Sequence, residues 1–123
     1  MKRLRFGSDA AFAPGEVLLE RVTVAPLTAS ITAGSAFQAA VFRLAAGGRI
    51  ARHPARCPQI LAVLEGTGEV NGPSGQVEPI VPGDAVYWAE GEAHETRTDV
   101  GLTALIIEGD GLVPYGVDGD DGP

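Results

Sequence analysis

The chain has 123 residues, a formal net charge of −7 and a hydrophobic content of 45%. This length fits a single domain that is large enough to bury a hydrophobic core. The acidic balance argues against nucleic acid as a partner. No segment reaches the roughly 18 apolar residues of a membrane span, and the basic start lacks the apolar run of a signal peptide. We therefore expect a cytoplasmic protein with neither a nucleic-acid nor a membrane partner.

The predicted elements are almost all strands. Short runs rich in Val, Ile, Leu and Phe recur between Gly and Pro residues, which is typical of β-strands separated by tight turns. After an N-terminal arm at 1–15, the runs predict strands at 16–25, 36–47, 48–53, 59–66, 67–72, 76–81, 84–89, 93–98 and 102–109. Residues 110–123 are predicted to form an acidic C-terminal tail. This spacing favours an all-β barrel or sandwich over 16–109.

The segment "PARCP" at 54–58 separates two of these strands and holds the only cysteine, Cys57. One cysteine excludes an internal disulfide. Proline favours a turn here. A nucleophilic cysteine would need a neighbouring base and a lowered pKa, and nothing in the sequence orients such a base. We interpret Cys57 as a packed turn residue.

Both histidines of the chain lie in spaced glycine motifs. The first motif runs from Gly47 through His53 and Gln59 to Gly66. The second begins at Gly83 and continues through Ala89, Glu90, Gly91 and His94 to Thr98. In spacing, these motifs resemble the two cupin motifs G-x5-H-x-H-x3-E-x6-G and G-x5-P-x-G-x2-H-x3-N. The resemblance covers roughly 37–109 and implies an antiparallel double-stranded β-helix, the jelly-roll barrel.

Four motif positions differ from the family pattern. Ala55 replaces a histidine and Gln59 replaces the glutamate, while Ala89 and Thr98 replace the proline and the asparagine. In metal-bearing cupins, three histidines and a glutamate at these positions hold one ion. The resemblance therefore implies a partly degraded metal site, in which His53, Gln59 and His94 would hold one divalent ion (Zn, Fe, Mn or Ni) or no metal at all.

Further residues extend this candidate site. Arg49 lies four residues before His53, so on an uninterrupted strand it would share the face of His53 and contact an anion. Tyr87 and Trp88 point to opposite faces of one strand, and the sequence does not decide which of them lines the barrel.

The sequence is compatible with two functions. The first is a small-molecule-binding cupin that holds its ligand through His53, Gln59, His94 and Arg49. Because Arg49 is positively charged, anionic ligands are among the candidates. The second is a metal-dependent isomerase, lyase or dioxygenase-like enzyme that uses His53, Gln59 and His94. The apolar segment "EVLLERVTVAPL" at 16–27 predicts a homodimer.

Overall fold

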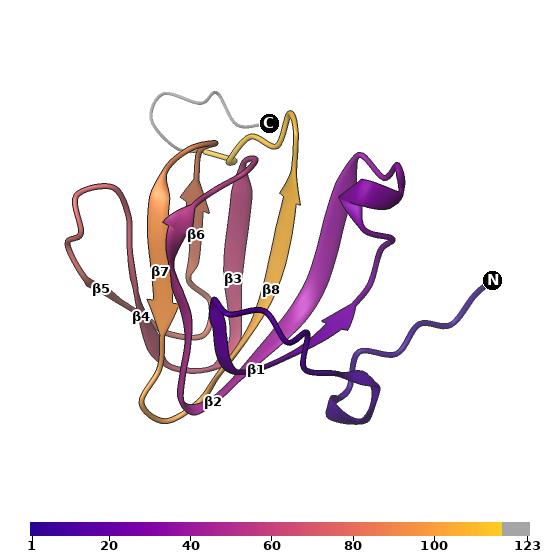
Figure 1. Cartoon of the computed structure of the whole chain (residues 1–123), viewed down its shortest axis with the longest axis horizontal. Helices are drawn as coiled ribbons and strands as arrows, with labels where there is room; N and C mark the ends of the chain where they lie inside the picture. Colours follow the sequence, from indigo (N-terminus) through magenta and orange to yellow (C-terminus); the bar gives the residue numbers. More distant parts are fainter. Residues whose placement is uncertain (117–123) are drawn as a thin grey trace.

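The computed structural model describes residues 1–116, except for the side chain of Ala33. The part of the predicted tail at 117–123 lies outside the described residues. Eight strands form one antiparallel sheet that curls into a nearly closed barrel (Figure 1). They are β1 (Leu19–Pro26), β2 (Phe37–Pro54), β3 (Gln59–Gly66), β4 (Gly68–Asn71), β5 (Glu78–Ile80), β6 (Ala85–Trp88), β7 (Ala93–Arg97) and β8 (Leu102–Gly109). The 3-10 turns η1 (Ser8–Ala10) and η2 (Ile31–Ala33) are the helical elements of the described chain.

The strand order in the sheet is β5-β4-β7-β2-β8-β3-β6, and β1 pairs with β2. All of these pairings are antiparallel, which confirms the predicted jelly-roll class. Among the described residues, no helix is long and apolar enough to cross a membrane.

The strand β2 is longer than the sequence predicted. The runs at 36–47 and 48–53 were expected as two strands, but they form one strand, Phe37–Pro54. Its first part pairs with β8 and its last part pairs with β7. The chain bends between the two parts at Gly47, whose φ of 79° favours glycine. Because β2 pairs with β8 along its first part and with β7 along its last part, it continues the sheet around the barrel, as Figure 1 shows.

The interior of the barrel holds a continuous core of inward-facing side chains, which includes Ile50, Leu61, Trp88, Ala104 and Ile106. Alternate residues of each strand supply it, as the period of two in a strand requires. In β8, for example, Leu102, Ala104 and Ile106 are buried while the residues between them are partly exposed. The polar side chains of His94 and Thr96 are also enclosed in this interior.

The pairing registers bring motif residues together. His53 on β2 lies directly opposite His94 on β7. Gln59 on β3 lies between Trp88 on β6 and Glu108 on β8. The fold thus gathers residues from both motifs at one end of the barrel.

The motif glycines Gly47, Gly66, Gly83 and Gly91 all have φ between 78° and 96°. Gly66 is further constrained, because a Cβ atom added there would lie 2.1 Å from the backbone oxygen of Gly101. At Gly47, an added Cβ would meet nothing within 4 Å. The two positions therefore share the backbone conformation but differ in available space.

We expect Gly66→Ala to lower the free energy of unfolding much more than Gly47→Ala. The second change imposes only the left-handed backbone penalty, about 1–2 kcal/mol. The first adds a clash with backbone that cannot be relieved by a side-chain rotation. Denaturant unfolding of both variants measures the difference, and equal losses would contradict this account.

Candidate functional site

The two histidines of the chain meet inside the barrel. Their ring centroids are 4.5 Å apart, and the ring planes are tilted by 52°. His94 is only 2% exposed, whereas His53 is half-buried. Because the residues are direct cross-strand partners, the contact follows from the β2–β7 register.

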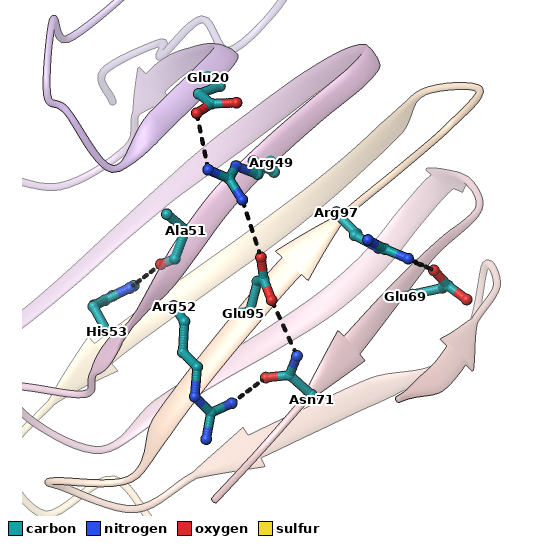
Figure 2. Close-up of polar contacts among 9 residues, drawn as sticks. All are labelled: Glu20, Arg49, Ala51, Arg52, His53, Glu69, Asn71, Glu95 and Arg97. Atoms are coloured by element: carbon teal, nitrogen blue, oxygen red, sulfur yellow. Dashed lines mark hydrogen bonds and ion pairs between the residues drawn. The ribbon is translucent and has the colours of Figure 1, made fainter. Parts of the chain in front are cut away.

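Each ring is oriented by a backbone carbonyl two residues earlier. The Nδ1 atom of His53 lies 2.7 Å from the carbonyl oxygen of Ala51, a contact visible in Figure 2. The Nδ1 atom of His94 lies 3.0 Å from the carbonyl oxygen of Glu92. A carbonyl only accepts, so each Nδ1 carries the proton and donates it. In the neutral rings, both Nε2 atoms are left as acceptors.

Trp88 also packs against His94. The two rings stack at a centroid distance of 4.2 Å and an angle of 23°. Trp88 is 3% exposed, and its Nε1 donates to the carbonyl oxygen of Asn71 at 3.1 Å. The structure thus places Trp88, rather than Tyr87, in the interior. Burial lowers the pKa of His94 and so favours the neutral form of its ring.

A cavity of about 530 Å³ opens beside His53. Its walls are mainly apolar and come from β1, β2, β8 and the N-terminal segment, with Phe12, Leu18, Val24, Phe42, Ile50 and Ile106 among them. Its polar lining includes His53, Gln59 and Glu108. His94 is not among the lining residues, and its ring contacts those of His53 and Trp88.

Glu108 is the site residue that the sequence analysis missed. Gln59 Nε2 donates to one oxygen of its carboxylate at 3.1 Å, and Arg56 donates to the other at 2.7 Å. The Glu108 side chain is 15% exposed. Its hydrogen bond, and then its charge, raise the pKa of Arg56. The available signal was alternation, since Glu108 follows Leu102, Ala104 and Ile106 at even spacing and so shares their inward face.

Arg49 does not line this cavity. Its guanidinium pairs instead with Glu20 at 3.1 Å and with Glu95 at 3.6 Å (Figure 2). The register of β2 shifts between Ile50 and His53, and both of these residues line the cavity although they are three apart. This irregularity reverses the alternation that the sequence argument assumed, so Arg49 lies on the opposite face from His53.

Cys57 lies in the turn between β2 and β3, where it is free and buried. Burial raises the pKa of its thiol, which disfavours the thiolate that a nucleophile needs. These observations agree with the interpretation of Cys57 as a packed turn residue.

The residues present do not fit a tightly held divalent metal ion. Within residues 1–116, no group of three His, Cys, Asp or Glu side chains is placed to bind one. The buried Ala55 stands at the second histidine position of the first motif and has no atom that could bind a metal ion. Gln59 supplies a neutral amide, and Arg56 already pairs with the nearby carboxylate of Glu108. Of the three histidines and one glutamate that the motif resemblance implies, the described chain has two histidines at the matching positions.

The buried ring of His94 predicts a pH dependence of stability. Its folded-state pKa lies below the unfolded value of about 6.5. Between the two pKa values, the unfolded chain binds more protons at this histidine than the folded chain does. The free energy of unfolding therefore falls as the pH drops through the unfolded-state pKa. We expect His94→Gln to flatten the loss of unfolding free energy between about pH 7 and about pH 5.5, measured by denaturant titration. An unchanged slope would contradict this assignment.

Comparison with known proteins places this geometry in a known architecture. No protein-family model and no curated protein matches the sequence. Solved structures do match. The polyketide cyclase RemF from Streptomyces resistomycificus is 22% identical with a TM-score of 0.75, over 93% of this chain and 87% of that chain.

Two further structures share the fold at 17% identity. An RmlC-like cupin from Shewanella frigidimarina has a TM-score of 0.73 over 89% of this chain and 91% of that chain. An acetylacetone dioxygenase from Acinetobacter johnsonii has a TM-score of 0.73 over 89% of this chain and 74% of that chain. The fold implied by the two glycine–histidine motifs is confirmed, and the described residues form a barrel with the fold of the cupin superfamily.

Proposed function

We propose that this protein binds a small organic molecule in the barrel cavity. The observation that carries the proposal is the cavity itself, about 530 Å³ in volume, with apolar walls and a polar group formed by His53, Gln59 and Glu108. This size and composition match those of small-molecule sites in proteins, which join an apolar lining to a few polar groups that fix orientation. The ligand then has an apolar body and a polar end.

The polar groups favour a ligand that donates hydrogen bonds. His53 has its Nδ1 on a backbone carbonyl, so its Nε2 accepts. Gln59 uses its amide nitrogen on Glu108, so its carbonyl oxygen also accepts. The carboxylate of Glu108 adds negative charge that repels an anion, although Arg56 partly offsets it. A hydroxyl or amide N–H therefore fits this end better than a carboxylate or phosphate.

The solved structures with this fold support the same class of ligand. Two of them are named a polyketide cyclase and an acetylacetone dioxygenase, names that describe enzymes acting on small organic molecules. At 22% and 17% identity they carry no specific reaction over to this chain.

The alternative function is a metal-dependent isomerase, lyase or dioxygenase-like enzyme. It would need His53, His94 and Gln59 to hold an ion, and the incomplete donor set weighs against it. The proposed binding function does not depend on a metal.

The test compares a cavity-filling variant with a matched control. Ala55 is buried and lines the cavity, whereas Ala62 on β3 is absent from its lining. We expect wild-type protein and Ala62→Phe to bind the neutral apolar fluorophore N-phenyl-1-naphthylamine, whose amine N–H is a hydrogen-bond donor, and Ala55→Phe to lose most of that binding. Native mass spectrometry of protein purified without a nickel column will show any small molecule retained from the cell.

Elemental analysis of the same preparation separates the two functions. Stoichiometric iron, zinc, manganese or nickel that disappears in the double variant His53→Ala, His94→Ala would favour the enzyme. Equal fluorophore binding by Ala55→Phe and Ala62→Phe, with both variants folded, would place the ligand outside the cavity and overturn the proposal.

We also propose that the chain forms a homodimer through the segment at 16–27. Strand β1 hydrogen-bonds to β2 along one edge, and within residues 1–116 its other edge meets only a single bridge between Phe12 and Val24. Apolar side chains near this edge are exposed, with Phe12 at 53% and Val17 at 94%. Pairing of such an edge with a second copy would cover both features.

Light scattering coupled to gel filtration tests the dimer. We expect wild-type protein at twice the chain mass of 12.7 kDa, and Val17→Glu at the monomer mass. Val100→Glu is the control, because Val100 is also exposed, at 73%, but lies between β7 and β8. A monomeric wild type, or an identical effect of both substitutions, would contradict this interface.

A further inference from the structure

A second groove, of about 540 Å³, lies between residues 13–15 and the β1–β2 pair. Its polar lining consists of Arg21, Thr23 and Arg43. No Asp or Glu is among its lining residues. This concentration of positive charge is unusual in a chain whose net charge is −7.

Arg43 has an unsatisfied guanidinium nitrogen. Its Nη1 atom is buried and has no hydrogen-bond partner within the described part of the chain. Arg43 and Thr23 are cross-strand partners, so their side chains lie next to each other on one face of the β1–β2 pair. The neighbouring Phe42 lines the main cavity, so Arg43 points to the opposite face. A buried charged donor without an acceptor is costly, and a bound acceptor would remove that cost.

Arg21 is held in an unfavourable backbone conformation at the same groove. Its φ of 56° is the one positive value among the described non-glycine residues. It sits at the register shift of β1 between Glu20 and Val22. Its Nη1 donates to the carbonyl oxygen of Ala46 at 3.4 Å. Strain of this kind in a non-glycine residue is characteristic of ligand-binding positions.

The other arginines of the barrel differ from these two. Arg49, Arg56 and Arg97 each pair with a carboxylate, and Arg52 donates to the side chain of Asn71. Between residues 1 and 116, neither Arg21 nor Arg43 takes part in an ion pair. The charge of these two guanidinium groups is therefore not neutralised by a carboxylate.

We propose that this groove binds a small oxyanion, a carboxylate or a phosphate group, through Arg21, Thr23 and Arg43. Guanidinium groups present planar pairs of N–H donors that match the oxygens of both anions, and the threonine hydroxyl supplies a further donor. The site is separate from the polar end of the main cavity, although Pro14 and Leu19 line both hollows. The proposal does not rest on the function assigned to that cavity.

The test titrates inorganic phosphate and, separately, acetate into the protein at constant ionic strength. Calorimetry gives the affinity, and the Nε–H resonance of Arg43 in NMR spectra reports contact with the anion. We expect that resonance to shift, and the affinity to fall about tenfold or more in Arg43→Gln, as expected for loss of a charged hydrogen bond. Which anion binds more tightly identifies the ligand chemistry.

Two further variants keep the test independent of folding defects. Arg21→Gly removes the charge while relieving the backbone strain, so we expect a stable protein with similarly weakened anion binding. Arg3→Gln removes the same charge from the exposed N-terminal segment and should bind as wild type does. The proposal is overturned if neither anion binds at millimolar concentration, or if Arg3→Gln loses as much affinity as Arg21→Gly. His53→Ala should leave phosphate binding unchanged, which separates this site from the main cavity.

Discussion

The barrel depends on β2, which hydrogen-bonds to β8 along its first part and to β7 along its last part. A strand of 18 residues cannot remain regular over such a path, because its partners lie on different sides of the barrel. The backbone adjusts at Gly47 and again between Ile50 and His53. These two irregularities decide which side chains of β2 face the interior, and hence the composition of the site.

The interior of the barrel divides into a filled part and an open part. Trp88 and His94 stack in the filled part, where burial favours the neutral form of the imidazole. His53 lies between the two parts, since it contacts His94 and also lines the cavity. The absence of a side chain beyond Cβ at Ala55 leaves room in the open part. The cupin pattern has a histidine at this position, so alanine here supplies no donor and leaves more open space beside His53.

The outer face of the same strands is organised by charge. A chain of contacts runs from Glu20 through Arg49, Glu95 and Asn71 to Arg52 (Figure 2). It links β1, β2, β7 and β4 across the surface. Arg49 and Glu20 are about half exposed, so each such pair stabilises the fold only weakly. Their main effect is to occupy Arg49 on the outer face, while Arg21 and Arg43 have no carboxylate partner within residues 1–116.

The sequence by itself determined the strands and the family of folds. Alternating apolar runs gave β3 and β8 their exact bounds, and the spacing of Gly47, His53, Gly83 and His94 indicated the jelly-roll barrel. These features are local, because strand periodicity and positive-φ glycines act within a few residues. The sequence did not predict that two of these strands join into β2. Two consecutive glycines, Gly47 and Gly48, are compatible with either a break between strands or a bend within one strand.

Only the tertiary structure decided the composition of the site. Alternation along β2 predicts Arg49 beside His53, but a one-residue shift of the pairing register between Ile50 and His53 places Arg49 on the outer face. Alternation along β8 indicates that Glu108 faces inward, but its contacts with Gln59 and Arg56 arise only when β3 pairs with β8. The choice of Trp88 over Tyr87 for the interior likewise follows from the pairing of β6 with β3. Irregularities and cross-strand neighbours are properties of paired strands, so a single strand's sequence cannot specify them.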